Sequence, residues 1–146
     1  MRSCDNGLIN SILSRYKTIC AEKNIIFNCD IRSKATDGIS DEDLTSLFCN
    51  LLDNAVMASS ENRNRFIDLQ AEKKNGTSFL VVSTVNSCTQ NPFDKNHKIN
   101  NSRHEYHGIG ISSIQKIAEK YRGNSTNYYN PEDNTFHSVV LLKVNC

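Results

Sequence analysis

The sequence predicts a two-layer α/β sandwich, in which a mixed, mostly antiparallel sheet of about five strands carries three helices on one face. The order of elements expected along the chain is α-β-α-β-β-long loop-α-β-β. This alternation favours a layer of helices packed against one sheet face. With 146 residues, the chain is predicted to form a single domain over 1–146.

Helical and strand patterns alternate through the first half of the chain. Residues 5–23 carry an apolar stripe at helical spacing, and residues 25–31 follow as a strand. A second helix is expected at 40–60, and two further strands at 65–71 and 78–86. The letters KKNG between these two strands indicate a hairpin.

A long polar segment divides the second half of the chain. Residues 87–107 are rich in Asn, Lys and His and show no periodicity, which is typical of a functional lid or of disorder. A third helix near 110–122 follows, beginning with the two glycines of HGIGI and ending at Gly123. Strands at 124–130 and 135–144 close the chain, turned at NPEDN.

The second helix is predicted to begin at Ser40. This residue precedes three carboxylates, an arrangement that resembles a capping box with negative charge at the positive end of the helix. An apolar stripe then marks the buried face of the helix. Over the whole chain the predicted core contains Leu44, Leu47, Leu51, Ile67, Leu69, Val81, Ile114, Ile117, Val140 and Leu142.

Composition and charge exclude several classes of function. The chain is 38% hydrophobic and 23% charged, as expected of a globular domain. A formal net charge of +1 without a basic stripe argues against a nucleic-acid partner. Apolar runs reach only about six residues, too few for a membrane span, so no membrane contact by this domain is expected. No signal peptide is recognisable, and a cytoplasmic domain is therefore predicted.

The cysteines are predicted to be reduced. The chain has six, at positions 4, 20, 29, 49, 88 and 146. Most of them fall within helix or strand patterns, and without an export signal a disulfide framework is disfavoured. No CxxC pair is present to suggest a zinc site.

Two asparagines within the second helix are candidate ligands. Asn50 and Asn54 are one turn apart, so they share a face, and the apolar stripe already accounts for the core-facing positions. Asparagine is a poor residue for a helix interior. Its amide, however, offers an oxygen to a hard cation and an NH₂ group to phosphate oxygens. Two solvated amides are the alternative interpretation of this pair.

Two further motifs have both a structural and a functional interpretation. Gly108 and Gly110 at a helix start allow close approach of the backbone, and the free amides of a first turn bind anions. A simple loop-helix junction would also use glycines there. Asn86 ends a strand beside the long loop, where its amide is placed either to recognise a base edge or to close a turn.

Together these motifs resemble the successive nucleotide boxes of the GHKL (Bergerat-fold) ATPase and kinase superfamily. The resemblance runs over nearly the whole chain, through LFCNLLDNAVMAS, VVSTVNS and HGIGISSIQKIAEKYRG. More narrowly, the chain is similar to the catalytic domains of peptide-pheromone-sensing histidine kinases of Gram-positive bacteria. The opening helix 1–23, which ends in CAEKNIIF, resembles the segment by which such domains leave their dimerisation helices.

The resemblance implies a role for each residue of the boxes. Asn54 matches the Mg²⁺ ligand, Asn50 faces the phosphates, and Asn86 occupies the place of the superfamily's adenine-reading Asp. The resemblance also implies contacts with ATP for Asp53 on the same helix, for Arg103 in the long loop, and for His107, Gly108, Ile109 and Gly110 of the HGIGI motif.

Residues 87–107 match the ATP lid, in which a phosphate-binding cation is expected. Arg103 and Lys98 are both candidates for this cation. The chain departs from the family at Met57, where an acid is usual, and at the Asp-x-Gly-x-Gly box, which is reduced to NSC. These departures concern the adenine contacts.

The residue at position 50 distinguishes two chemistries within the superfamily. Members that hydrolyse ATP place a Glu there as general base, whereas the amide of Asn50 cannot accept a proton from water. This favours a histidine kinase that passes the γ-phosphoryl group of ATP to a protein nucleophile, with catalysis by positioning and charge stabilisation. The four histidines lie outside the opening helix, so the phosphoacceptor histidine is expected outside this chain.

The resemblance also implies cofactors and partners. They are ATP and Mg²⁺, the dimerisation and phosphoacceptor domain of the parent kinase, and a downstream response regulator, with the parent receptor in the plasma membrane. Three alternatives stay open: a Ser/Thr kinase of the anti-sigma type, a nucleotide-binding pseudokinase, and a metal-binding loop at His104 and His107.

Overall fold

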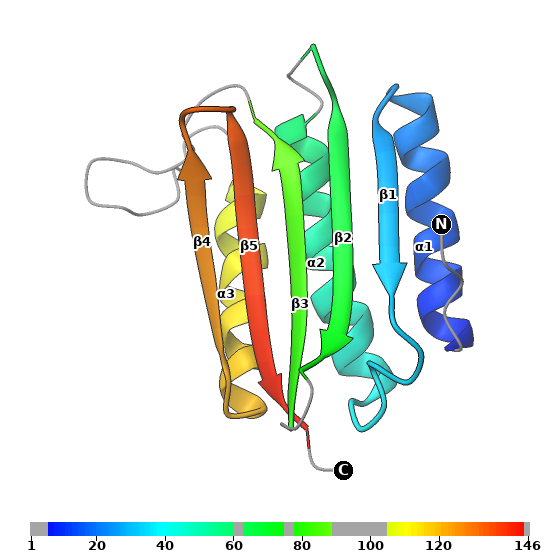
Figure 1. Cartoon of the computed structure of the whole chain (residues 1–146), viewed down its shortest axis with the longest axis vertical. Coiled ribbons are helices and arrows are strands. Elements are labelled where there is room, and N and C mark those ends of the chain that lie inside the picture. The colour runs from blue at the N-terminus through cyan, green and yellow to red at the C-terminus, as the bar shows by residue number, and fades with distance from the viewer. Residues whose placement is uncertain (1–5, 60–62, 75–77, 89–104, 145–146) are drawn as a thin grey trace.

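Three helices lie against one face of a five-stranded sheet in the described part of the chain (Figure 1). The structure is a computed structural model that describes residues 6–59, 63–74, 78–88 and 105–144, with only the helical backbone described over 105–111. The other face of the sheet carries no helix in these ranges. The predicted two-layer α/β sandwich is therefore confirmed.

The sheet is mixed and mostly antiparallel. The strands follow one another in space in the order β1-β2-β3-β5-β4. Among neighbouring strands, only β1 and β2 are parallel, and the three other pairs are antiparallel. The strands are β1 (Ile26–Ile31), β2 (Phe66–Lys73), β3 (Phe79–Ser87), β4 (Asn124–Asn130) and β5 (Thr135–Lys143). Both predicted hairpins, β2–β3 and β4–β5, are confirmed.

Two of the three helices connect strands that are not joined by hairpins. Helix α1 (Gly7–Glu22) precedes β1, α2 (Asp41–Ser59) links the parallel strands β1 and β2, and α3 (Glu105–Lys120) lies between β3 and β4. Because β3 and β4 both run antiparallel to β5, α3 also belongs to a crossover between parallel strands. The end of α2, the start of α3 and the end of β3 consequently meet at one end of the sandwich (Figure 1).

Side chains from the sheet and all three helices share one core. Nine of the ten predicted core residues are buried, but Val81 is not. On β3 the buried positions facing the helices are Leu80, Val82 and Thr84, so Val81 points to the open sheet face, in line with the period of two along a strand. The prediction for Val81 was wrong because the two alternating sets of side chains on this strand both contain apolar residues. The sequence pattern therefore does not show which set faces the helices.

Helices α1 and α2 each begin directly after a residue whose side chain caps the N-terminus of the helix. The Ser40 hydroxyl accepts a hydrogen bond from the backbone N–H of Asp43 at 3.2 Å, which confirms the predicted N-terminus of α2. In α1 the Asn6 side chain accepts from the backbone N–H groups of Leu8 and Ile9 at 2.9 and 3.1 Å. These bonds satisfy donors that lack a partner within the helix.

Helix α3 differs from the prediction at both ends. It begins at Glu105, so residues 105–107 of the expected lid are helical, and Gly108 and Gly110 lie inside the helix rather than at its start. At the other end, the helix was expected to end at Gly123 but ends at Lys120, and Arg122 takes the left-handed conformation (φ 56°) that follows many helices. Gly123 is required for another reason, since a Cβ there would lie 1.7 Å from the backbone oxygen of Leu141.

The remaining expectations concern cysteines and membranes. Cys20, Cys29, Cys49 and Cys88, the four within the described ranges, are free thiols, as predicted. Burial raises the pKa of the Cys20 thiol to about 11. Within the described ranges, no helix combines the length and the apolar character that a membrane crossing requires.

Candidate functional site

The outer face of α2 carries two polar stripes, one on each side. Asp43 defines the first stripe because its carboxylate contacts α3. Asn50 and Asn54 lie seven and eleven residues beyond it, about two and three turns of helix, so both amides lie on the side of α2 that faces α3. Asp53, by contrast, accepts a hydrogen bond from α1. Consecutive residues, Asp53 and Asn54, point about 100° apart on the helix and therefore face different neighbours.

The two amides differ in their hydrogen bonding. The Asn50 side-chain NH₂ donates to the backbone carbonyl of Ser46 at 2.7 Å and to the Ser46 hydroxyl at 3.3 Å, which fixes the orientation of the amide. The Asn54 side chain is half-buried and makes no hydrogen bond to any other residue in the described ranges. Asn54 thus keeps both its oxygen and its NH₂ group for a ligand.

Buried polar side chains lie beneath the end of α2, where β3 ends. Asn86 is 2% exposed, and its NH₂ group donates to the backbone carbonyl of Ser87 at 2.9 Å. The hydroxyls of Ser87 and Ser59 are 2.7 Å apart, and the Ser87 hydroxyl also accepts from the backbone N–H of Phe66 at 3.2 Å. This end of the core thus contains several polar side chains, and the Asn86 amide oxygen has no partner in the described ranges.

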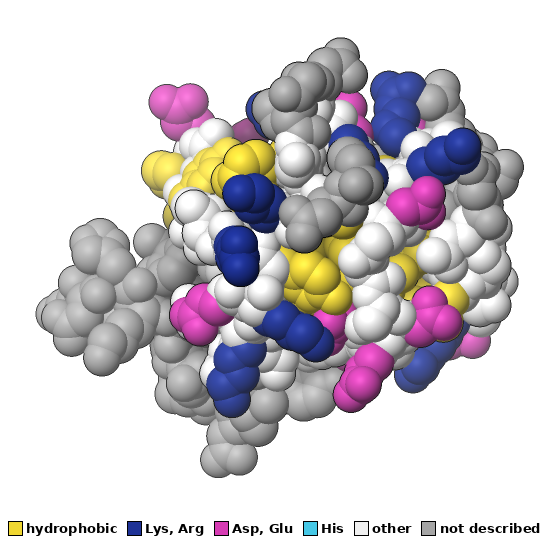
Figure 2. Space-filling model, turned by 90° about the horizontal axis from the view of Figure 1, so that it is seen from below, with side chains coloured by type: hydrophobic (Ala, Val, Ile, Leu, Met, Phe, Trp, Pro, Cys, Tyr) yellow, Lys and Arg dark blue, Asp and Glu magenta, His cyan; other side chains and the backbone are white. Residues whose placement is uncertain are grey.

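The opposite end of α2 is tied to α3. The Tyr121 hydroxyl donates to Asp43 at 2.6 Å, and the Lys120 ammonium lies 2.9 Å from the same carboxylate oxygen. These two groups hold the pKa of Asp43 below its usual range. Charged side chains of both signs spread over this end of the molecule (Figure 2). The junction fixes the C-terminal end of α3, while the end bearing Gly108 and Gly110 lies at the candidate site.

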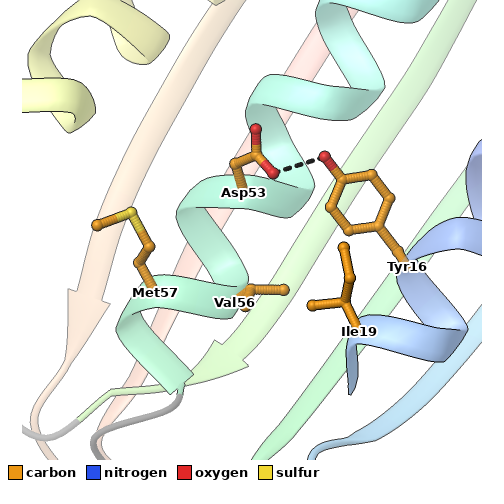
Figure 3. Close-up of a pocket in the computed structure, with 5 residues that line it drawn as sticks. All are labelled: Tyr16, Ile19, Asp53, Val56 and Met57. Carbon is orange, nitrogen blue, oxygen red and sulfur yellow. Dashed lines mark hydrogen bonds between the residues drawn. The ribbon is translucent and has the colours of Figure 1, made fainter. Parts of the chain in front are cut away.

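A pocket lies on the other side of α2, between α2 and α1. It has a volume of about 330 Å³ and is lined by Tyr16, Ile19, Asp53, Val56 and Met57 (Figure 3). The Tyr16 hydroxyl donates to the Asp53 carboxylate at 2.5 Å and to the backbone carbonyl of Cys49 at 3.3 Å. Burial, together with the bond to Asp53, raises the pKa of Tyr16 well above its usual range.

The structure brings together only part of the site expected from the sequence. By helical spacing, Asn50 and Asn54 continue the stripe of α2 that begins at Asp43 beside α3, the helix that contains Gly108 and Gly110, and Asn86 lies in the last two residues of β3. The side chains of His107 and Ile109 lie outside the described residues, although their backbone is helical. Arg103, Lys98 and His104 lie outside the described ranges, as does most of the expected lid.

Sequence reasoning missed the contributions of Tyr16, Ser59 and Ser87. Tyr16 was assigned to the apolar stripe of the opening helix, and nothing in its spacing distinguishes a core tyrosine from one that binds a carboxylate. Ser59 and Ser87 belong to segments far apart in sequence that meet only in the fold.

In the described ranges, no cluster of three or more His, Cys, Asp or Glu residues is arranged to hold a metal ion.

Comparison with solved structures places the chain among histidine kinase catalytic domains by fold. The catalytic domain of histidine kinase ThkA matches with a TM-score of 0.71 and 19% identity over 96% of this chain and 92% of that one. A histidine kinase from Burkholderia phymatum matches with a TM-score of 0.69 and 13% identity, covering 99% of this chain and 70% of that one. Histidine kinase AdeS of Acinetobacter baumannii matches with a TM-score of 0.65 and 10% identity, covering 95% of this chain and 64% of that one.

Sequence comparison gives a more direct assignment. No curated protein sequence matches the chain. A family model described as the GHKL domain matches residues 40–143, from the cap of α2 to the end of β5. This match covers well over half of the chain and includes both asparagines of α2, Asn86 and the glycines of α3. The chain therefore belongs to the GHKL domain family.

Proposed function

We propose that the chain is the ATP-binding catalytic domain of a sensor histidine kinase, which donates the γ-phosphoryl group of ATP to a histidine outside this chain. The observation that carries the proposal is the common direction of Asn50 and Asn54 toward α3, with Asn86 at the same end of the sandwich. Family membership and the fold of histidine kinase catalytic domains support it.

Three described side chains have the chemistry that Mg-ATP requires. Asn54, half-buried and without a hydrogen bond in the described ranges, has an oxygen suited to Mg²⁺. Asn50 has its NH₂ group bound by Ser46, so the atom that it offers beside the phosphates is its oxygen, which is suited to Mg²⁺. Asn86 is buried with its oxygen free of described partners, so this oxygen is suited to accept from the adenine amino group. When bound, Mg²⁺ would neutralise charge that develops on the phosphates.

The same residues favour phosphoryl transfer over hydrolysis. The Asn50 amide is held by Ser46 and cannot act as a general base at neutral pH, so it does not activate water. The task left to the protein is to position the nucleotide and stabilise its charge. Asp53 belongs to the rim of this site, since its carboxylate is directed to α1.

The backbone of α3 would complete the phosphate site. The first four N–H groups of a helix lack partners within the helix and favour anions, and in α3 these belong to residues 105–108. Gly108 is thus the glycine with a free amide, while Gly110 allows close approach. His107, Ile109 and the lid cation, Arg103 or Lys98, complete the proposed set of contacts.

We infer a narrower assignment for the parent protein from the motifs themselves. Asn86 in place of Asp, together with the spacing of NLLDNA and HGIGI, resembles peptide-pheromone-sensing kinases of Gram-positive bacteria. On this proposal the parent receptor lies in the plasma membrane, its dimerisation domain supplies the phosphoacceptor histidine, and a response regulator acts downstream.

Mapping the nucleotide on the protein tests the location of the site. Titration of isotopically labelled protein with Mg-ATP should shift the side-chain amide resonances of Asn50, Asn54 and Asn86. Resonances of the Lys120–Asp43 junction, at the other end of α3, should stay in place. Saturable shifts confined to residues away from these three amides would contradict the proposed site, and the absence of any shift would contradict nucleotide binding.

A further inference from the structure

The one phenol of α1 that reaches α2 binds the turn that carries both amides. Tyr16 is 1% exposed, and its hydroxyl donates to the Cys49 carbonyl and the Asp53 carboxylate. Cys49 immediately precedes Asn50, and Asp53 immediately precedes Asn54. The hydroxyl therefore holds the residues next to both amides, from the side of α2 that faces α1.

Packing around this contact is incomplete. The pocket of about 330 Å³ adjoins the Tyr16 ring, and its walls come from Ile19 of α1 and from Val56 and Met57 of α2 (Figure 3). An open pocket beside the contact means that fewer side-chain contacts oppose a small rotation or shift of α2 against α1 there. The hydrogen bonds of this hydroxyl therefore add to the packing that sets the position of the 49–53 turn relative to α1.

The environment keeps this hydroxyl protonated. Burial and the neighbouring carboxylate both raise the pKa of Tyr16, so the phenol remains a donor throughout the physiological pH range. A hydrogen bond between a neutral donor and a carboxylate is stronger than one between two neutral groups. The contact is therefore both directional and permanent under ordinary conditions.

We propose that Tyr16 is a positioning residue for the nucleotide site: through Asp53 and the Cys49 carbonyl it sets the placement of Asn50 and Asn54, and so makes Mg-ATP affinity depend on how α1 is docked. This inference rests on the proposed function. It assigns to the α1–α2 contact a role beyond packing, because the phenol fixes the turn that carries the ligands.

Tyr16→Phe tests the proposal because it removes the hydroxyl and keeps the ring. We expect calorimetric titration to show Mg-ATP affinity about tenfold weaker, equivalent to about 1.4 kcal/mol. The side-chain amide resonances of Asn50 and Asn54 should also move in the nucleotide-free protein, a change that stability loss alone does not produce. Thermal melts of each variant verify that the protein is folded at the titration temperature.

Tyr121→Phe is the matched control. It removes the same kind of bond, a phenol donating to a carboxylate of α2, but at Asp43, more than a turn before Asn50. The Mg-ATP affinity of Tyr121→Phe should differ less than twofold from that of the unsubstituted chain. Equal weakening by both variants would overturn the proposal, since general loosening of α2 would then explain the effect.

A double-mutant cycle tests whether Tyr16 acts through Asp53. The loss of affinity caused by Tyr16→Phe should be much smaller in the Asp53→Ala background than in the unsubstituted chain, because the hydroxyl there has only the Cys49 carbonyl left as a partner. Additive losses would overturn the assignment, as would unchanged affinity in Tyr16→Phe. If the unsubstituted chain itself fails to bind Mg-ATP, it is the proposed function that fails.

Discussion

Two tyrosines hold α2 by carboxylates on its two sides. Tyr121 binds Asp43 on the side of α3, and Tyr16 binds Asp53 on the side of α1. Of the two candidate ligands, Asn50 lies between these carboxylates in the helix, and Asn54 directly follows Asp53. The placement of these amides thus depends on contacts that α2 makes with both neighbouring helices.

The hydrogen bond and ion pair at Asp43 predict that the free energy of unfolding depends on pH in the acid range. Its pKa is lowered in the folded state, so the stabilisation is present above the unfolded value of about 3.9 and is lost as pH falls through the folded value. Asp43→Asn should lower the free energy of unfolding at pH 7 by about 1–3 kcal/mol. Urea unfolding at several pH values should show this difference shrinking below about pH 4.

Asp41→Asn is the matched control for that experiment. Asp41 lies in the same first turn of α2 but is exposed, so its substitution removes one charge near the helix N-terminus without a bond to α3. Its cost should be about 0.3–1 kcal/mol. If the Asp43→Asn difference is the same at pH 3 and pH 7, the network does not titrate as described.

Single residues were predictable where their chemistry was unusual for their position. Asn50 and Asn54 were recognisable as ligand candidates because amides are costly inside a helix. The direction of Asp53 was not predictable, because helical spacing shows that it lies off the core but not which neighbouring helix it faces. That distinction depends on long-range packing, which the Tyr16 contact supplies.

At the scale of elements, the predicted helices and strands were found with small shifts, and the largest error was the start of α3. HGIGI was expected to open the helix because glycines favour junctions, yet the helix begins at Glu105. Gly123 was expected only to end the helix, whereas the structure requires a glycine there because the backbone directly before β4 lies very close to Leu141 of β5. Such tertiary contacts override local propensity.

Gly123→Ala should therefore be strongly destabilising. Its Cβ would lie 1.7 Å from the Leu141 carbonyl oxygen, so the β4–β5 hairpin must shift. We expect a loss of about 1–3 kcal/mol in chemical denaturation, the usual range for overpacking. Gly7→Ala, at the first position of α1 with no atom within 4 Å of the added Cβ, is the control and should be neutral or slightly stabilising. Equal effects at both positions would contradict the proposed cause.

Helix α1 should be the element most sensitive to alkali. Its buried Tyr16 and Cys20 both have raised pKa values, that of Cys20 about 11. Their contributions are therefore fully present below the unfolded values, near 10 and 8.5, and are lost as pH rises above them. Hydrogen exchange or near-ultraviolet circular dichroism should show α1 loosening before the sheet above about pH 9. Tyr16→Phe should reduce this sensitivity, and loosening that begins in β4 would contradict it.

At the scale of the whole molecule, the fold class followed from the alternation of helical and strand patterns and from two hairpin signals. The parallel pairing of β1 with β2 was not specified by any local signal, since it depends on the crossover through α2. The orientation of β3 was likewise hidden, because Val81 and Val82 are equally apolar and only the packed layers distinguish them.

The arrangement of the whole sandwich places the candidate site at one end and a fixed junction at the other. The end of α2, the start of α3 and the end of β3 meet at the same end (Figure 1), while Asp43, Lys120 and Tyr121 join the helices at the far end. Movement of the site-bearing end of α3 against α2 is thus expected to occur about an anchored opposite end.

Paired titrations and melts of Asn54→Ala test the central claim, that α2 binds Mg-ATP through its amides. The unsubstituted chain should bind Mg-ATP, and Asn54→Ala should bind about 10- to 100-fold more weakly, since a contact to a charged group contributes about 1.5–3 kcal/mol. Asn50→Ala should show a smaller loss. Thermal stability of Asn54→Ala should be equal or slightly higher, because alanine is the better helix former. Asn10→Ala, a matched helical substitution in α1, should leave affinity unchanged. Affinity of Asn54→Ala equal to that of the unsubstituted chain would contradict the nucleotide site on α2, and with it the kinase assignment.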